Sequence, residues 1–500
     1  MQAADTATTT ELPASARATG PLLATAALVV LADYLILTSE PGIGWFVFAV
    51  AVALVIGGFA MVRGRRRPAL LAVALSTIAA LPFIEAPSLP ALVVGSLALG
   101  IAALLAARLL PWALGEIPAI LLRYGVLAPF RLIADAVSAR AGGRQPGLAR
   151  MLLRQLIGWL VPLVFLVIFL WLFVVANPVF DLAASQLSLG QFSFPEPVRL
   201  VAWLVLAAAI WALLRPRLLR WIGSKQPAAP VVVAESLLFG RAAILRSLVI
   251  FNAVFAIQTF MDITYLWGGV ALPDGMSHAD YAHRGAFPLI VTALLAAAFV
   301  LAAMRRNGAG ERSGLIRGLV YAWIGQNILL CVSAILRLDL YVEAYSLTEL
   351  RVVAGIWMGL VAIGLGLILL RIALRRSNGW LIAANLVSLA VTLWACAWVD
   401  FPAVIARFNV EHSREISGSG VALDLDYLRE LGPTVIPALD DYVARTGQTG
   451  QTDAIHSWLV AEAWRDPPED WRGWTWRGQR LAAYLDSRAG NDNNSSLQSY

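Results

Sequence analysis

The sequence predicts an all-α fold: a polytopic integral membrane bundle of about eleven transmembrane helices, followed by a small helical C-terminal module. Its 500 residues are 59% hydrophobic and only 14% charged, with a mean hydropathy of +0.73. These values lie outside the range of soluble globular proteins. The apolar residues gather in runs long enough to cross a hydrocarbon core of about 30 Å. Basic residues alternate between successive loops, which is typical of multi-pass proteins.

The N-terminal segment 1–20 is rich in Thr and Ala and has Arg17 as its only basic residue. We expect it to be disordered and cytoplasmic, and not to be a signal peptide, because the basic n-region and a clear cleavage site are missing. The transmembrane bundle then covers 21–401. Its apolar runs lie at about 22–38, 43–62, 69–86, 90–108, 156–180, 198–214, 247–270, 287–304, 318–336, 352–374 and 379–400.

Arginine and lysine separate the loops into two sets. The loops 63–67, 108–154, 215–246, 305–317 and 371–376 contain four, seven, six, four and three of them, 24 together. The loops 39–42, 87–89, 181–199, 271–286 and 337–351 contain four together. The positive-inside rule therefore predicts that the first set is cytoplasmic. With eleven spans in a cell inner (plasma) membrane, the N-terminus is then cytoplasmic and the C-terminus extracytoplasmic.

The C-terminal tail, 402–489, has a different composition from the bundle. With the final residues 490–500 it contains nine arginines and fourteen acidic residues, and its apolar spacing predicts helices at about 421–431, 434–446, 452–465 and 475–488. Tryptophan favours the headgroup zone of a bilayer, and the tail has five: Trp458, Trp464, Trp471, Trp474 and Trp476. We expect a small extracytoplasmic helical module near the membrane surface, and disorder in the polar end 490–500.

Two cytoplasmic segments, 116–140 and 230–246, mix apolar stretches with arginines. Helices of this kind lie in the membrane interface with their arginines near anionic headgroups. The alternative is that they are ordinary connecting helices packed on the bundle. The expected partners are therefore the lipid bilayer, with anionic lipid headgroups or another envelope protein as further candidates. The charge of +6 does not indicate nucleic-acid binding, because most of the arginines belong to loops on one face.

Four stretches resemble a signature of an uncharacterised bacterial integral-membrane family, of the domain-of-unknown-function 4173/4153 type. They are ADYAHRG at 279–285, YSLTELR at 345–351, VIARFN at 404–409 and LDLDYL at 423–428. Together they extend over roughly residues 240–480. The resemblance implies a membrane fold and location, and it brings no reaction with it.

Ionisable side chains inside a bilayer cost about 2.5–3.5 kcal/mol each to insert, so each is a candidate functional group. Four acids qualify: Asp33, Glu85, Asp262 and Asp400. Gln258 and Asp262 share a helix face because they are four residues apart. We predict an outward-facing polar binding site that contains Asp262, Tyr281, Arg284, Glu349 and Arg351. Arg284 and Arg351 would pair with Asp262 and Glu349 or hold an anionic headgroup. The alternative is that these residues are helix caps and ion pairs that fix the bundle.

No catalytic residues, metal ligands or cofactor are predicted. The sequence has no HExxH, GxSxG or Walker A motif. The spacing His278-x-Asp280-x-x-His283 matches no established metal-ligand motif, and Cys331 and Cys396 lie in apolar runs without a CxxC pair.

Three classes of function remain open. The sequence favours a structural, sensory or regulatory envelope protein with an outward-facing polar site and tail. A transporter or lipid flippase is the alternative, although no internal repeat of the kind that transporters often contain is evident. A membrane-embedded transferase is less favoured, because the first outer loop, 39–42, is very short.

Overall fold

The computed structural model of the chain describes residues 16–111, 114–125, 131–132, 135, 197–217, 241–264, 313–464 and 470–497. Regular structure within these ranges is entirely helical. The chain divides into two compact units, and the short segment Pro468–Thr475 belongs to unit 1 although its chain neighbours belong to unit 2.

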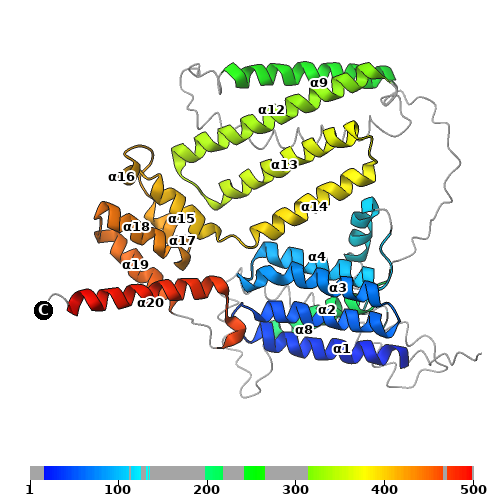
Figure 1. Cartoon of the computed structure of the whole chain (residues 1–500), viewed down its shortest axis with the longest axis horizontal. Coiled ribbons are helices and arrows are strands. Elements are labelled where there is room, and N and C mark those ends of the chain that lie inside the picture. Colours follow the sequence, from blue (N-terminus) through cyan, green and yellow to red (C-terminus); the bar gives the residue numbers. More distant parts are fainter. Residues whose placement is uncertain are drawn as a thin grey trace, which may run out of the picture. The chain divides into compact units, whose positions relative to one another are not determined.

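Unit 1 contains α1 (Ala16–Ala32), α2 (Gly44–Val62), α3 (Arg66–Ala80), α4 (Leu89–Ala106) and α8 (Pro197–Leu214) (Figure 1). Small side chains line the contacts among these helices. Ala53, Ala69, Ala72, Ala102 and Ala103 are each 0% exposed. Small residues allow helix backbones to approach closely, which increases van der Waals contact inside a membrane. Alanine therefore stabilises this unit through packing.

Unit 2 contains η3 (Leu114–Glu116), α9 (Arg241–Asp262), α12 (Gly314–Tyr345), α13 (Glu349–Ala373) and α14 (Asn378–Cys396). Trp323 of α12 is central to its core: it stacks with Phe251 at 5.4 Å between ring centroids and meets Phe255 edge-on at 5.9 Å. Helix α12 has 32 residues. At 1.5 Å per residue it is about 48 Å long, so it is longer than a hydrocarbon core of about 30 Å and extends beyond it.

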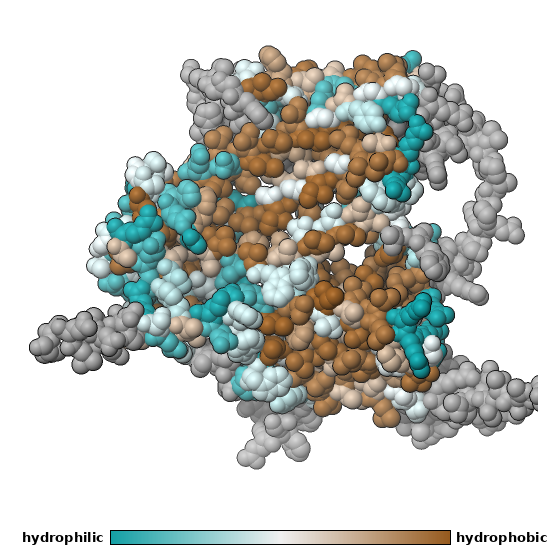
Figure 2. Space-filling model, viewed as in Figure 1, coloured by the Kyte–Doolittle hydropathy of each residue, from teal (hydrophilic) through white to brown (hydrophobic). Residues whose placement is uncertain are grey.

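The chain is an all-α polytopic membrane protein, as predicted. Eight described helices are long and apolar enough to cross a membrane, and Val198–Leu214 is a shorter apolar helix. These nine helices correspond to nine of the predicted runs; the runs at 156–180 and 287–304 lie outside the described residues. Figure 2 shows hydrophobic residues over the middle of the helices and hydrophilic residues at their ends and over the tail.

One predicted loop boundary is wrong. Residues 337–345 were expected to lie in a loop, but they form the last turns of α12. Asp339 and Glu343 are exposed there while Arg337 and Val342 are buried. The helix continues past the apolar run because Asp339 and Glu343 face outward, while Arg337 is buried within it.

The tail forms the rest of unit 2, apart from its segment 470–475. Its helices are α15 (Phe401–Glu411), α16 (Arg414–Ser417), α17 (Leu425–Glu430), η5 (Pro433–Val435), α18 (Ile436–Thr446), α19 (Gly450–Ala463) and α20 (Trp476–Leu497). They match the four predicted helical segments, and α20 extends into 490–500, for which disorder is predicted. Val435, Ile436, Leu439 and Leu459 are 0% exposed, so the tail has a hydrophobic core of its own.

Candidate functional site

Three of the four family-like stretches meet in unit 2. The connection 346–348 joins α12 to α13, and Asn409 of α15 binds its middle residue twice. The side-chain Oδ1 of Asn409 accepts the backbone N–H of Leu347 at 2.7 Å, and its Nδ2 donates to the Leu347 carbonyl at 2.9 Å. The hydroxyl of Tyr427 accepts the N–H of Glu349 at 3.0 Å. We call the stretches 345–351, 404–409 and 423–428 the tail junction; the fourth stretch, 279–285, lies outside the described residues.

The connection has a strained backbone at Ser346. Its φ is +66° and its ψ 172°, a combination that is essentially restricted to glycine and costs of order 1–3 kcal/mol for other residues. Arg351 stabilises the same turn, because its Nη1 donates to the Tyr345 carbonyl at 2.6 Å and to the Ser346 carbonyl. Its guanidinium also lies 4.5 Å from the ring centre of Tyr341. The turn is therefore held in an unfavourable conformation by surrounding side chains.

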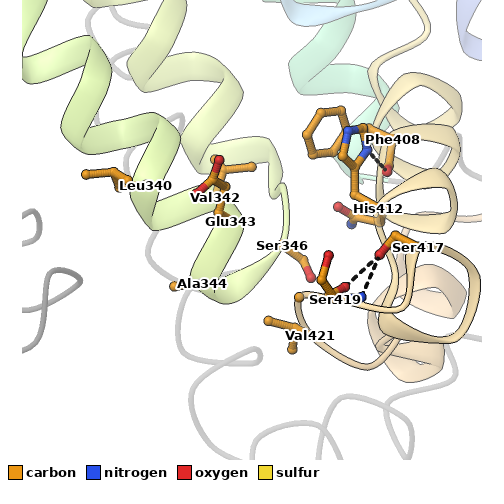
Figure 3. Close-up of a pocket in the computed structure, with 12 residues that line it drawn as sticks. Leu340, Val342, Glu343, Ala344, Ser346, Phe408, His412, Ser417, Ser419 and Val421 are labelled. Atoms are coloured by element: carbon orange, nitrogen blue, oxygen red, sulfur yellow. Dashed lines mark hydrogen bonds between the residues drawn. The ribbon is translucent and has the colours of Figure 1, made fainter.

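A hollow of about 620 Å³ opens beside the tail junction, between the last turns of α12, α15 and the turn 417–421 (Figure 3). Apolar groups such as Leu340 and Val421 form part of its wall. The polar groups that line it are Glu343, Ser346, Asn409, His412, Ser417 and Ser419. A mostly apolar cavity with a few polar groups is the usual form of a small-molecule site.

Among the described residues, only Nδ1 of the His412 ring has a hydrogen-bond partner. Its Nδ1 lies 2.9 Å from the Phe408 carbonyl, and a carbonyl oxygen can only accept, so Nδ1 carries a proton. In the neutral ring, Nε2 then has the lone pair and accepts a hydrogen bond. The ring stacks on Phe408 at 4.1 Å between centroids (Figure 3). Glu343 and His412 thus provide an ionisable group on each side of the hollow.

The predicted site residues are only partly brought together. Glu349 and Arg351 belong to the tail junction, whereas Tyr281 and Arg284 lie outside the described residues. The expected pairing of Arg351 with an acid is wrong: Arg351 donates to the carbonyls of Tyr345 and Ser346. The reason is that α12 ends at Tyr345 and leaves its last carbonyls without intrahelical donors.

Asp262 is 1% exposed and forms an ion pair with Arg337, which is 3% exposed. The pair joins the end of α9 to α12. Gln258 donates to Oδ1 of Asp262 at 3.0 Å, which confirms that these two residues share a helix face. This geometry matches the alternative in which Asp262 fixes the bundle, and a binding role for Asp262 stays a prediction.

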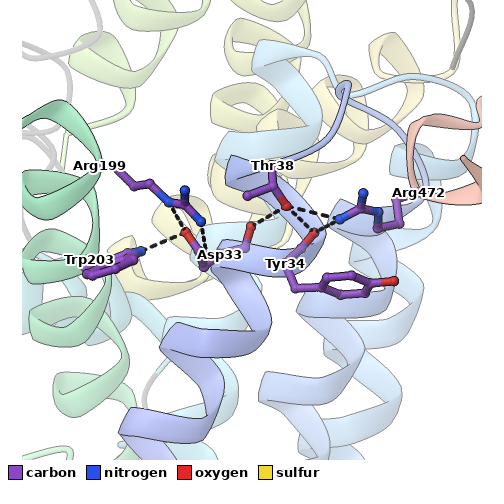
Figure 4. Close-up of polar contacts among 6 residues, drawn as sticks. All are labelled: Asp33, Tyr34, Thr38, Arg199, Trp203 and Arg472. Carbon is purple, nitrogen blue, oxygen red and sulfur yellow. Dashed lines mark hydrogen bonds and ion pairs between the residues drawn. The ribbon is translucent and has the colours of Figure 1, made fainter. Parts of the chain in front are cut away.

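Asp33 also forms an interhelical ion pair, in unit 1. Arg199 of α8 donates to it at 2.7 and 2.5 Å, and Trp203 Nε1 donates at 2.8 Å (Figure 4). Asp33 begins a π-helix, Asp33–Leu37, that continues α1. On the next turn Arg472 donates to the Tyr34 carbonyl and, at 3.1 Å, to Thr38 Oγ1. Segment 470–475 is thereby attached to unit 1.

Asp400 was predicted to lie within the last span, and this is wrong. The span ends at Cys396, and Asp400 is the N-cap of α15, where its Oδ1 accepts the N–H of Ala403 at 3.3 Å. Arg477 lies 3.3 Å from its other oxygen. Glu85 directly follows the short helix η2 (Leu81–Ile84) and is 4% exposed.

A buried polar cluster around Asp440 connects three helices of the tail, α18, α19 and α20. Asp440, 6% exposed, accepts the Tyr484 hydroxyl at 2.8 Å and forms an ion pair with Arg488. His456 Nε2 lies 3.1 Å from its other oxygen. Burial, and then the hydrogen bond to Asp440, raises the pKa of Tyr484, and burial raises the pKa of Tyr427. Both phenols are therefore neutral at physiological pH.

Sequence reasoning missed Asn409 and the hollow. Asn409 is the last residue of the stretch VIARFN, so the resemblance contained a signal for it. His412 belongs to the tail that the sequence predicts to be extracytoplasmic, but no sequence motif singles it out. Among the described residues no group of three or more His, Cys, Asp or Glu is placed to hold a metal ion.

Residues 22–442 match the family described as Domain of unknown function (DUF4153). The match includes the whole membrane bundle and the tail as far as α18, and so it contains all three stretches of the tail junction. Comparison with curated proteins and with solved structures gives no match.

Proposed function

The chain belongs to the DUF4153 family, and on that premise we propose that it is a sensory or regulatory membrane protein of the cell envelope. Its folded tail binds a ligand beside the tail junction and transmits the bound state to α12 and α13. The double hydrogen bond of Asn409 to Leu347 carries this proposal. These two hydrogen bonds couple α15, the first tail helix, to the strained turn between α12 and α13. At a strained turn, a small shift on ligand binding can switch the backbone between two distinct conformations.

We further propose that the tail and the hollow face the extracytoplasmic side of the inner membrane. The support is the distribution of Arg and Lys, with 24 in one set of loops and four in the other. The ligand would be a small amphipathic molecule with hydroxyl or amine groups. Glu343, the Nε2 of His412 and the serine hydroxyls would bind its polar groups, and the apolar wall would cover the rest.

Hydrogen exchange on the full chain in lipid nanodiscs tests the coupling. Asn409→Ala should speed amide exchange at 346–352, in the connection and the start of α13, and leave the tail core of Val435 to Leu439 protected. Asn385→Ala is the matched control, because the Asn385 Nδ2 donates within its own helix, to Leu381 at 2.9 Å, and to no other described residue. Unchanged exchange at 346–352 in Asn409→Ala would contradict the proposal.

A cellular test separates this function from the alternative. A strain that lacks the chromosomal copy is complemented with the full chain, with Glu343→Gln/His412→Gln, or with Glu411→Gln, whose exposed side chain pairs with Arg407 outside the hollow. The double variant should fail to complement at normal membrane abundance, and Glu411→Gln should complement. Full complementation by the double variant would refute a role for the hollow.

A transporter or flippase is the second candidate, and one observation favours it. The ion pair Asp262–Arg337 is buried within apolar helices with Gln258 beside it, and ionisable groups at such places mark ion or substrate paths in many transporters. Transport would be favoured if a correctly folded Asp262→Asn variant fails to complement the strain while Glu343→Gln/His412→Gln complements it.

A further inference from the structure

Two arginines form ion pairs with one carboxylate at the end of α8 in unit 1, and two further arginines lie close to them. Asp135 Oδ2 lies 3.2 Å from Arg215 Nη1, and its Oδ1 lies 3.0 Å from Arg217 Nη1. Trp211 Nε1 also donates to Asp135, at 3.2 Å. Arg131 Nη1 donates to the Arg215 carbonyl at 3.5 Å. Arg63, which follows the end of α2, lies close enough for its charge to act on Arg215. We call Arg63, Arg131, Arg215 and Arg217 the arginine cluster.

Aromatic rings support three of the four guanidinium groups. Arg63 lies over Phe59 at 5.9 Å, Arg131 over Tyr124 at 5.1 Å and Arg215 over Trp211 at 5.2 Å from the ring centres. The hydroxyl of Tyr124 donates to the Ala212 carbonyl at 2.9 Å, which fixes that ring at the end of α8. A ring occupies the flat face of a guanidinium and leaves its N–H edges available. The groups are therefore oriented before any ligand binds.

The arginine cluster has an excess of positive charge. Asp135 forms ion pairs with two of the four guanidinium groups, and within the described residues no second carboxylate is ion-paired with the cluster. The Asp135 side chain is 14% exposed and that of Arg217 is 60% exposed. Burial lowers the pKa of Arg215; Asp135 raises it, and Arg217 and Arg63 lower it further. Burial lowers the pKa of Arg131; Tyr124 and Asp135 raise it, and Arg217 lowers it further. The like charges are thus close enough to repel each other, and a bound anion would relieve this repulsion.

The place of the arginine cluster in the fold suggests the kind of anion. Helix α2 ends at Val62 and α8 at Leu214, so Arg63 and Arg215 directly follow the ends of apolar helices and Arg217 lies two residues further on. Residues just beyond a span lie at the depth of lipid headgroups. Guanidinium groups bind phosphate oxygens through paired N–H donors.

We propose that the arginine cluster binds a phosphate group, carried by the headgroup of an anionic phospholipid or free in solution. The site is independent of the hollow beside the tail junction. Asp135 holds Arg215 and Arg217 in place, and the phosphate binds the N–H edges that Asp135 leaves open. Arg63 and Arg217 are the exposed members of the cluster. Their replacement should therefore weaken phosphate binding without disturbing the fold.

The experiment uses the full chain in neutral detergent micelles, with titrations of phosphatidylglycerol, phosphatidylcholine and inorganic phosphate followed by the thermal unfolding midpoint. The test variant is Arg63→Gln/Arg217→Gln. The matched control is Arg66→Gln/Arg67→Gln, which removes the same charge from two exposed arginines in the first turn of α3. At roughly 1.5 kcal/mol for each hydrogen bond between charged groups, and tenfold for each 1.4 kcal/mol, the test variant should bind about 100-fold more weakly, and the control variant, which removes none of these hydrogen bonds, should lose far less.

Phosphatidylglycerol should raise the unfolding midpoint of the unmodified chain, and phosphatidylcholine should not. If inorganic phosphate alone gives the same protection and the same loss in the test variant, the source is free phosphate. The proposal is overturned if the control variant loses as much affinity as the test variant, or if neither phosphatidylglycerol nor phosphate protects. The unfolding midpoints measured without ligand show whether the variants fold. If the double test variant is destabilised, the affinities of the single variants Arg217→Gln and Arg67→Gln are compared instead.

Discussion

The ion pair Asp262–Arg337 allows a quantitative test of how the membrane part of unit 2 is held together. The side chain of Asp262 is 1% exposed and that of Arg337 is 4% exposed. The two residues are 75 positions apart in the sequence, and their ion pair connects α9 to α12. Three variants complete a double-mutant cycle: Asp262→Leu, Arg337→Met and the two combined. Each single change leaves one charge buried without this partner.

Breaking a buried ion pair by removing one partner costs about 3–5 kcal/mol, whereas replacing both partners with apolar residues is often neutral or stabilising. We therefore expect each single variant to lose about 3–5 kcal/mol of unfolding free energy. The combined variant should recover most of this loss, so that the coupling energy is at least about 2 kcal/mol. Inside apolar helices the same logic holds, because a buried charge that loses its ion-pair partner is costly there.

Reversible unfolding of the full chain in mixed micelles measures these free energies. Asp441→Asn is the control, because Asp441 pairs with Arg445 on the surface of α18 with side chains 52% and 46% exposed. A surface pair at this spacing contributes only about 0.3–0.5 kcal/mol. Single variants that lose less than about 1 kcal/mol, or losses that simply add in the combined variant, would refute the reasoning.

Three further predictions concern the tail and the tail junction. Asn409→Ala should lower the unfolding free energy by about 1–3 kcal/mol, because both backbone groups of Leu347 lose a buried partner; equilibrium unfolding checks it, and a loss below about 0.5 kcal/mol would contradict it. Ser346→Gly should stabilise the chain by about 1 kcal/mol, since glycine adopts the local φ and ψ without strain; a lower unfolding midpoint would exclude strain at this turn. Because the pKa of Tyr484 is raised above 10.0, its phenol contributes stability that is complete below about pH 10 and is lost as pH rises further. Tyr484→Phe should therefore make the decline in stability above pH 10 shallower, and an unchanged slope would contradict the role of this phenol.

The helices were predictable because their information is local. Length and hydropathy of each run located nine described helices, and the spacing of four between Gln258 and Asp262 located a shared face. The tail helices followed from their apolar spacing in the same way. Each of these inferences needs only residues within one helix.

The contacts of the candidate site were not predictable, because they join residues far apart in the sequence. Nothing local indicates that Arg337 pairs with Asp262, or that Asn409 binds Leu347, 62 residues away. A periodic pattern shows which face of a helix is buried but not which helix covers it. Asp400 is different, since Asp followed by Pro402 at the second helical position is a helix-start signal that the sequence contained.

The orientation of the hollow is the claim on which the proposed function most depends, and cysteine labelling in intact cells tests it directly. Cys331 and Cys396 are first replaced by alanine, since both are free thiols. Ser419→Cys then places a thiol at the exposed edge of the hollow, and Arg66→Cys places one at the predicted cytoplasmic side. A membrane-impermeant maleimide should label Ser419→Cys in intact cells and Arg66→Cys only after permeabilisation. The opposite pattern would contradict the account.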